Sequence, residues 1–490
     1  MGRMNYVQGA SRGQITLMPE CVDDYINEDN AVRVIDIYID RLDLNTLGFT
    51  KVELCETGRP PYAPQDLLKL YVYGYMNRIR SSRRLETETK RNVEVMWLLK
   101  KLSPDHKTIS RFRSENCKAL KGVFRDFVKM CVGLGLYGRE LAAIDGSKFK
   151  AVNSTDRNLS VKELNERIKR LNYRIDEYLQ QMNEADKAED TTETTDADVK
   201  EIIERLAERR DTYETYLEEL TENGETQMSL TDPDARLMKG ATGFDVSYNV
   251  QTAVDSKNKL IAEFNVTDEG NDQKQLTKMA TAAAEILEVP NITAVADTGY
   301  NSASEIVMCI ENGIIPHVAG SEGTYCVPCE AHEAQKITSH DNGKGIHLKE
   351  RNIFICPMGN IMPPKHYKNT DRTGIYYNYR ACSNCTCRCT KVKYRTFALR
   401  MKKNDFTKEH NADNLYIKQI HIVPDSAMIE QRKSLVEHPF GTIKRTMDAG
   451  YLLTKGKPKV TGEFSLAFLA YNMKRVINII GAKKLIETMV

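Results

Sequence analysis

Apolar residues recur at helical spacing at both ends of the chain. A helix is predicted to begin at Pro64, because apolar or small residues then recur three or four positions apart, at Leu67, Leu70, Tyr71 and Gly74. Residues 430–490 have a helical pattern as well, and Thr461–Met489 carries a strong apolar face. We therefore predict mainly helical structure for residues 1–120 and for the C-terminal end of the chain.

Short apolar runs in the middle of the chain predict β-strands, at Glu140–Ile144, Phe244–Val254, Leu260–Val266 and Ile292–Ala296. The second and third runs are joined by a turn and are expected to pair antiparallel. Helical patterns follow at Asp272–Leu287 and from about Ser302. Two strands are expected to end in a carboxylate, Asp145 and Asp297, although Asp145-Gly146 is also a common turn sequence. Strands that alternate with helices predict an α/β core.

Heptad spacing marks the segment between the first strand and the others. Apolar residues repeat in two series, Leu164, Ile168, Leu171, Ile175, Leu179 and Met182, and then Ile203, Leu206, Tyr213, Leu217 and Leu220. An acidic, Thr-rich gap at Asn183–Asp198 separates the two series. Two such helices with a polar tip predict an antiparallel coiled-coil hairpin. No residue of this segment suggests chemistry, so we interpret it as an insertion that contacts a partner or another subunit.

The composition is that of a folded protein without a membrane span. Of the 490 residues, 41% are apolar and 28% are charged, which excludes collagen-like, mucin-like and wholly disordered chains. Lys474 and Arg475 interrupt the most apolar run, which is shorter than the ~18–20 residues of a membrane-spanning helix. Met1–Gly13 has no apolar block of the signal-peptide type. We therefore expect a cytoplasmic protein.

A net charge of +2 hides an uneven distribution of charge. Residues 155–230 contain 21 acidic and 11 basic residues, so the rest of the chain is basic. Basic residues cluster between Arg78 and Arg91 and again between Lys391 and Lys403. Such clusters suit a polyanionic partner such as double-stranded DNA. For any single cluster, the alternative is a solvated helix face.

A turn followed by a basic helix is predicted near residue 105. Ser103-Pro104-Asp105 breaks the helical pattern, and Thr108–Arg113 continues it with Arg111 and Arg113 near the start of the second helix. This arrangement resembles a helix-turn-helix and would bring both arginines to DNA. Any helical hairpin with a basic second helix has the same pattern, so that alternative stays open.

Three carboxylates are candidates for metal chemistry. Asp145 and Asp297 each follow an apolar strand, and Glu437 lies in Val436–Lys444. Mg²⁺ prefers oxygen ligands and keeps several waters, so a few carboxylates and a substrate phosphate complete its shell. Two such ions about 3.5–4 Å apart suit phosphodiester cleavage. Because the three residues are far apart in the chain, their presence alone is weak evidence.

Four local sequences point to a known family. They are Ala143–Lys148, Tyr248–Gln251, Ala296–Tyr300 and Val436–Arg445. In this order, and over about residues 15–475, the chain resembles the DDE transposases of bacterial insertion sequences. The resemblance implies a ribonuclease-H-like catalytic core in which Asp145, Asp297 and Glu437 are catalytic and bind Mg²⁺ or Mn²⁺. It also implies a helical N-terminal DNA-binding region and cut-and-paste chemistry.

Related transposases carry Tyr, Arg and Lys at set distances from the catalytic Glu. Here Lys444 holds the Lys position, Lys433 with Arg432 beside it holds the Arg position, and Glu430 replaces the Tyr. On one ideal helix Lys433 and Lys444 would fall within about 40° of Glu437, beside the phosphates of bound DNA. If the helix instead begins at Pro439, the relation to Lys433 fails.

Seven of the twelve cysteines lie within residues 311–405, at Cys326, Cys329, Cys356, Cys382, Cys385, Cys387 and Cys389. The spacing Cys-x₂-Cys is typical of zinc knuckles, and a cytosolic chain would not use these residues as disulfides. The most plausible ligand set for a structural Zn²⁺ is Cys356, Cys382, Cys385 and Cys389. The alternative is a group of reduced cysteines without metal.

The predicted fold class is α/β, with a ribonuclease-H-like core that is interrupted by insertions. Its segments are a helical N-terminal DNA-binding domain (1–120), the first part of the core (121–155), the coiled-coil hairpin insertion (156–230), the second part of the core (231–310), the Cys-rich insertion (311–405), and a C-terminal helical part of the core that carries Glu437 (406–490).

The expected function is that of an Mg²⁺-dependent DNA transposase, an endonuclease and strand transferase that cleaves and joins DNA at the ends of its own insertion sequence. A ribonuclease-H-like nuclease without strand transfer would use the same residues. An inert, transposase-derived DNA-binding regulator is a third hypothesis, which the presence of all three carboxylates disfavours. Because two transposon ends are held together, we expect at least a homodimer on DNA. The sequence reveals neither the terminal repeats nor the target site.

Overall fold

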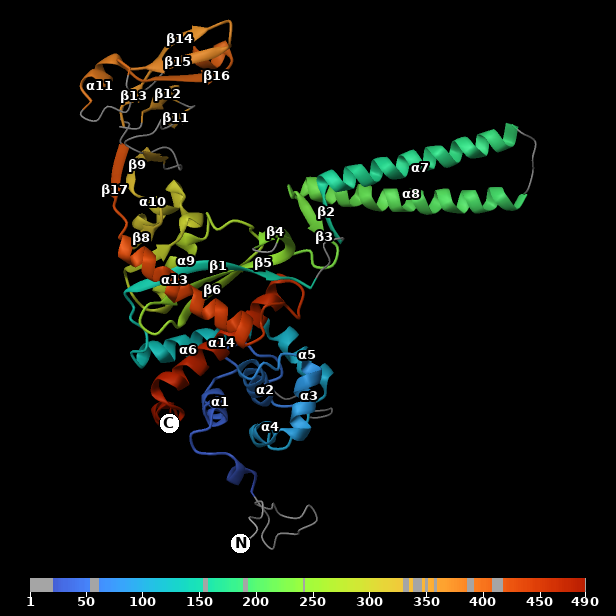
Figure 1. The fold of residues 1–490 in the computed structure, drawn as a ribbon, viewed down its shortest axis with the longest axis vertical. Coiled ribbons are helices and arrows are strands. Elements are labelled where there is room, and N and C mark those ends of the chain that lie inside the picture. Colours follow the sequence, from blue (N-terminus) through green and yellow to red (C-terminus); the bar gives the residue numbers. More distant parts are fainter. Residues whose placement is uncertain are drawn as a thin grey trace, which may run out of the picture. The chain divides into compact units, whose positions relative to one another are not determined.

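The computed structural model describes most of the chain (Figure 1). The described residues are 21–52, 61–152, 157–187, 193–240, 243–328, 335–337, 346–348, 351–356, 359–385, 392–407 and 417–489. The chain divides into two compact units, a helical unit (residues 1–124, 445–449 and 461–490) and an α/β unit (residues 125–444 and 450–460). None of the described helices is long and apolar enough to cross a membrane.

Helices with buried faces build the helical unit. They are α1 (Ala31–Asp40), α2 (Pro64–Met76), α3 (Ser82–Arg91), α4 (Val93–Leu98), α5 (His106–Glu115), the first part of α6 (Cys117–Gly133), most of α14 (Lys457–Ile480), and α15 (Ala482–Met489). Helix α2 begins at Pro64 as predicted, because the fixed φ of proline suits a first helical turn. Leu68, Leu70 and Tyr71 of α2 are fully buried, so this helix forms the centre of the unit.

The predicted amphipathic stretch at the C-terminus forms two helices. Gly481 separates α14 from α15 and has a φ of 83°, a left-handed conformation that glycine adopts without strain and that often ends helices. Helix α14 also carries Glu463, whose buried carboxylate lies 3.1 Å from the buried guanidinium of Arg80. This ion pair connects the turn before α3 to α14 inside the helical unit.

A six-stranded mixed sheet forms the centre of the α/β unit. Its strands are β1 (Leu141–Lys150), β4 (Arg236–Gly240), β5 (Gly243–Asp255), β6 (Ile261–Thr267), β7 (Ile292–Ala296) and β8 (Ile314–Val318). The order is β4-β5-β1-β7-β8, and β6 also pairs with β5. Strands β1, β7 and β8 are parallel, whereas β4, β5 and β6 form antiparallel pairs and β5 is antiparallel to β1.

Strand β1 is longer than the sequence predicts. We expected it to end before Asp145, but it continues to Lys150 because β5 pairs with it antiparallel as far as Ser247. Asp145 therefore lies inside β1 rather than at its C-terminal end. Its parallel pairing with β7 does end earlier, at Ala143 and Val295. The predicted strand Ile292–Ala296 and the antiparallel pair β5–β6 are confirmed.

Helices cover both faces of this sheet. Helix α13 (Ser426–Gly441) contacts β1 and β7, and its Leu435 and Val436 are buried against Leu141, Ala143 and Val295. Helix α9 (Leu276–Ile286) also contacts β1 and β7, and α10 (Ala303–Glu311) packs on it. Asp272, just before α9, lies against Gly146, whose side of β1 is opposite to that of Asp145, so α9 covers the opposite face. Pro439 lies inside α13, which continues into a π-helical turn at Thr442–Thr446. The alternative in which the helix begins at Pro439 is wrong.

A long helical hairpin and a short strand pair follow β1. Helices α7 (Val161–Lys187) and α8 (Glu193–Glu222) lie side by side, and β2 (Asn158–Ser160) pairs with β3 (Gln227–Ser229) at their base (Figure 1). The heptad positions Leu164, Leu171, Tyr213 and Leu220 are buried in one cluster between the helices. The two helices therefore hold each other through an apolar seam.

Among the described residues between 323 and 422, the strands form three small antiparallel sheets. They contain β9 (Gly323–Pro328), β10 (Gln335–Ile337) and β17 (Ile417–Ile422), then β11 (Ile346–Leu348), β12 (Ile353–Ile355) and β13 (Ile361–Met362), then β14 (Pro364–Lys368), β15 (Thr373–Tyr377) and β16 (Thr396–Arg400), with the short helices α11 (Tyr379–Ser383) and α12 (Lys403–Phe406). Aromatic residues and Cys356 and Cys382 share one buried cluster here.

Candidate active site

The parallel pairing of β1 with β7 brings Asp145 and Asp297 next to each other. The last paired residues are Ala143 and Val295, two positions before each aspartate. Side chains alternate along extended backbone, and Asp297 keeps an extended conformation. Asp145 therefore points to the same face as Ala143, and Asp297 to the same face as Val295. That face packs against α13. Both carboxylates are therefore directed towards α13.

Arg432 of α13 lies between the two carboxylates. Its Nη1 is 3.2 Å from Asp145 Oδ1, and its Nη2 is 3.5 Å from Asp297 Oδ2. The Arg432 side chain is only 11% exposed, compared with 23% for Asp145 and 41% for Asp297. The positive charge of the guanidinium thus reduces the repulsion between two neighbouring carboxylates in a partly desolvated place.

Burial raises the pKa of Asp145 to about 6. Arg432 and a hydrogen bond from the backbone of Gly146 oppose this increase, whereas the nearby charges of Asp297 and Asp272 contribute to it. The environment therefore disfavours the ionised carboxylate despite the ion pair with Arg432. Any further positive charge placed beside such a carboxylate stabilises its ionised form.

Sequence reasoning missed Asp272, which lies in the turn before α9. Its Oδ1 accepts hydrogen bonds from Asn249 Nδ2 at 2.7 Å and from Gln251 Nε2 at 2.6 Å. Both amides belong to β5, and Tyr300 OH donates to the other end of the Gln251 amide. The sequence held a signal, because Asn249 and Gln251 belong to one of the four recognised local sequences. It did not show which carboxylate these amides contact.

Glu437 does not join the two aspartates in this structure. Leu435 and Val436 of α13 are buried, whereas Glu437 is exposed. On an ideal helix it lies about 140° around the axis from Arg432, on the outward face. Among the described residues, no three His, Cys, Asp or Glu side chains are arranged to hold a metal ion. The structure thus brings together two of the three predicted ligands.

The two predicted lysines of this region have different surroundings. Lys433 is exposed and lies on the same side of α13 as Glu437. Lys444, in the π-helical turn, points towards β1, where its Nζ donates to Ser147 Oγ at 2.7 Å and to Lys148 O at 3.0 Å. It also lies 4.4 Å from the centre of the Phe149 ring, and burial lowers the pKa of its amine. Lys444 is therefore the lysine held beside Asp145.

The chemistry of the donor set suits a hard divalent cation. Mg²⁺ takes carboxylate oxygens and keeps several waters, so two carboxylates together with a substrate phosphate can retain it. Asp145 and Asp297 already direct oxygens at one cationic group, the guanidinium of Arg432. Asp145 and Asp297 therefore fit the Mg²⁺ or Mn²⁺ ion that the sequence resemblance implies.

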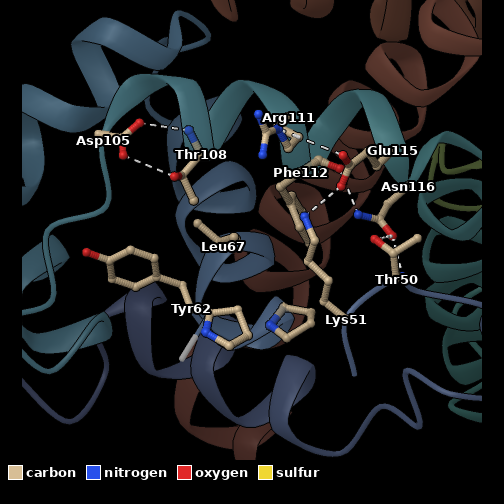
Figure 2. A pocket seen from close by; sticks show the side chains of 12 residues that line it. Thr50, Lys51, Tyr62, Leu67, Asp105, Thr108, Arg111, Phe112, Glu115 and Asn116 are labelled. Carbon is tan, nitrogen blue, oxygen red and sulfur yellow. Dashed lines mark hydrogen bonds and ion pairs between the residues drawn. The ribbon is translucent and has the colours of Figure 1, made fainter. Parts of the chain in front are cut away.

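The two arginines predicted to contact DNA differ in exposure. Arg111 of α5 is 69% exposed and lies beside a cavity of about 340 Å³, where Glu115 faces both Arg111 and Lys51 (Figure 2). Arg113 is only 7% exposed; it donates to Tyr75 OH and lies over the ring of Tyr71. Its charge supports the interior of the helical unit, so we do not retain Arg113 as a DNA contact.

Three of the four predicted zinc ligands fall within the described residues, and Cys389 lies outside them. Cys356 and Cys382 are buried in the same cluster. The backbone N–H of Asn360 lies 3.2 Å from Cys356 Sγ, and that of Arg395 lies 3.5 Å from Cys382 Sγ. Cys385 is partly buried, three residues after Cys382. Cys356 and Cys382 thus share one buried cluster, and each sulfur receives a contact from a backbone N–H group.

Two family models match parts of the chain. A "Transposase domain (DUF772)" matches residues 20–115, and a "Transposase DDE domain" matches residues 355–477, which include α13. These matches support an insertion-sequence DDE transposase. They imply an enzyme that cuts and joins DNA, with DNA as its partner. No curated protein and no solved structure matches the chain.

Replacing Asp145 should change how stability depends on pH in metal-free protein. The folded state raises the pKa of Asp145 from 3.8 to about 6, so folding favours the protonated form, and stability is lost as pH rises through this range. Asp145→Asn removes that cost. We expect the variant to match the wild type near pH 4 and to be more stable by on the order of 3 kcal/mol at pH 7.5. Urea unfolding in EDTA measures this difference, and a gap that does not change with pH would contradict the prediction.

Proposed function

We propose that this chain is a metal-dependent DNA transposase that cleaves and joins phosphodiester bonds at the ends of its insertion sequence. The observation that carries the proposal is the placement of Asp145 and Asp297 around one cationic group at the end of the β1–β7 pair. The mixed sheet, with these carboxylates on its central strands and helices on both faces, supports a ribonuclease-H-like core.

Asp145 and Asp297 are the residues that would hold Mg²⁺ or Mn²⁺, with Glu437 as the third ligand that the resemblance implies. Bound divalent ions supply an activated oxygen nucleophile and stabilise the leaving oxygen, the layout of two-metal phosphodiester chemistry. Glu437 lies on α13, five residues after Arg432. Its participation requires the outward face of α13 to turn towards Asp145, and the distortion at Pro439 and the π-helical turn is a place where α13 can adjust.

Arg432 and Lys444 supply positive charge on the α13 side of the site. Arg432 offsets part of the negative charge of the two aspartates in the metal-free protein. Its planar guanidinium is suited to bind a phosphate once the carboxylates hold a metal ion. Lys444 is held by Ser147 Oγ and Lys148 O, so its ammonium group stays beside β1. Lys433 lies on the exposed side, where flanking phosphates of a bound duplex would lie.

Exchange of single carboxylates tests the proposal. Asp145→Ala, Asp297→Ala and Glu437→Gln should each reduce nicking of a transposon-end duplex by more than the roughly 10–100-fold that outer-shell changes cause. The cause is loss of a metal ligand, so end binding in a gel-shift assay should remain. Glu288→Gln, on the turn before β7, serves as a matched control. An Asp297→Ala protein that still nicks the end would contradict the assignment.

A strand-transfer assay with pre-cut ends separates the transposase from its alternatives. Joining of the 3′ ends to a target duplex is expected of a transposase. Cleavage without joining would indicate a nuclease, and tight end binding without Mg²⁺- or Mn²⁺-dependent nicking would indicate an inert regulator.

Because transposition joins two ends, we propose at least a dimer on DNA, with the α7–α8 hairpin as a candidate contact.

Arg111 of α5 is proposed to contact the DNA backbone. Arg111→Ala should weaken end binding several-fold and lower the slope of log affinity against log salt by about 0.9, because one phosphate contact is lost. Arg111→Lys keeps the charge and serves as the control, with an unchanged slope. Fluorescence anisotropy at a series of salt concentrations measures both quantities. An Arg111→Ala protein with the wild-type slope would remove Arg111 from the interface.

We also propose a structural Zn²⁺ held by Cys356, Cys382, Cys385 and Cys389. The shared burial of Cys356 and Cys382 and the backbone N–H groups at their sulfurs support it. Protein purified without chelator should contain about one zinc per chain by mass spectrometry. Cys382→Ser should lose this metal, whereas Cys21→Ser, at an exposed isolated cysteine, should retain it. A zinc content near zero in the wild type would leave the reduced-cysteine alternative.

A further inference from the structure

A chain of hydrogen-bonded side chains lies behind the two aspartates. Tyr300 OH donates to Gln251 Oε1, and Gln251 Nε2 donates to Asp272 Oδ1 at 2.6 Å. The side chains of Tyr300 and Gln251 are fully buried. Tyr300 lies three residues after Asp297, and Gln251 lies opposite Gly146, which follows Asp145. The chain therefore connects the two backbone segments that carry the aspartates.

The charge of Asp272 orients this chain of hydrogen bonds. An ionised carboxylate only accepts, so the NH₂ group of Gln251 must face it, and Asn249 Nδ2 adds a second donor at 2.7 Å. The carbonyl end of Gln251 then faces Tyr300, whose hydroxyl must donate. Burial keeps that hydroxyl protonated, because it raises the pKa of Tyr300 well above its ordinary value. One carboxylate thus sets the direction of every hydrogen bond up to the turn after β7.

The backbone alone does not hold the two aspartates at a set distance. Parallel pairing between β1 and β7 stops at Ala143 and Val295, and Asp297 then begins a short turn in which it accepts from Gly299 N–H at 2.8 Å. Close packing replaces the missing pairing. A β-carbon at Gly146 would lie 2.7 Å from Asp272 Oδ1, so the absence of a side chain there allows Asp272 and Gln251 to approach β1.

We infer that Asp272, Gln251 and Tyr300 form a brace that positions Asp145 and Asp297 for a shared divalent cation. The three are positioning residues, because they act through the backbone segments on either side and through the Gln251 amide. The inference rests on the proposed function for the identity of the cation site. The hydrogen bonds of the brace are independent of that proposal.

Binding of Mn²⁺ to the full chain without DNA tests the brace. Tyr300→Phe removes only the hydroxyl and should weaken binding about tenfold, within the range seen when partners behind metal ligands are lost. Tyr248→Phe is the matched control. Tyr248 is also fully buried on β5, but its hydroxyl donates to Asp232 Oδ1 at 2.8 Å, away from the brace. Electron paramagnetic resonance of free Mn²⁺ measures the affinity, and Asp145→Ala identifies the part of the binding that belongs to this site.

A double-mutant comparison shows whether Tyr300 acts through Gln251. Gln251→Ala should weaken Mn²⁺ binding by a similar factor, and Tyr300→Phe added to it should cause little further loss, because the interaction is already absent. Asp272→Asn should also weaken Mn²⁺ binding, and it replaces either of the other variants if that variant fails to fold. Wild-type affinity in Tyr300→Phe or in Asp272→Asn would overturn the brace, and so would fully additive effects of the two changes at Tyr300 and Gln251.

Hydrogen exchange followed by mass spectrometry tests the brace in metal-free protein. In Tyr300→Phe the peptides that contain residues 143–148 and 297–301 should exchange several-fold faster than in the wild type, and Tyr248→Phe should leave them unchanged. Unchanged exchange in Tyr300→Phe would overturn the brace even if the protein binds no Mn²⁺. If the variants show the expected changes in exchange and in Mn²⁺ affinity but the wild-type protein cuts no DNA, the proposed function is contradicted and the brace is not.

Discussion

The candidate site of the α/β unit depends on the attraction between the guanidinium of Arg432 and the carboxylates of Asp145 and Asp297. Parallel pairing of β1 and β7 places two acidic residues on one face, and α13 covers that face. Without a cation between them, two partly buried carboxylates would repel each other and lose hydration together. The packing of α13 is therefore coupled to the electrostatics of the site, because one helix supplies both the apolar cover and the positive charge.

This site lowers the stability of the folded, metal-free protein. Burial raises the pKa of Asp145 to about 6, and the charges of Asp297 and Asp272 act in the same direction. This free energy becomes available to any cation that replaces Arg432, so the same desolvation that destabilises the free protein favours binding of a divalent ion. The brace behind the aspartates adds rigidity where strand pairing has ended, through the buried side chains of Gln251 and Tyr300 and the carboxylate of Asp272.

Much of the fold and part of the site could be predicted from the sequence. The start of α2 at Pro64, the strand Ile292–Ala296 and the β5–β6 pair follow from local patterns of apolar and turn residues. The position of Asp145 inside a long strand did not follow, because pairing with β5 extends β1 through polar residues. Arg111 and Arg113 show the same limit, since neighbouring arginines of one helix differ from exposed to buried only through the helices packed around them.

By itself, the sequence determined which residues are candidates for chemistry and roughly which elements bear them, because residue type and local periodicity are properties of short segments. Tertiary structure alone decided that Arg432 rather than Lys433 meets the aspartates, that Glu437 faces outward, and that Asp272 joins Gln251 and Tyr300. These outcomes depend on which face of α13 packs on the sheet and on the register of β1 with β5 and β7. Helix rotation and strand register are set by contacts between segments that lie about a hundred residues or more apart in the chain, so the local spacing of residues does not predict them.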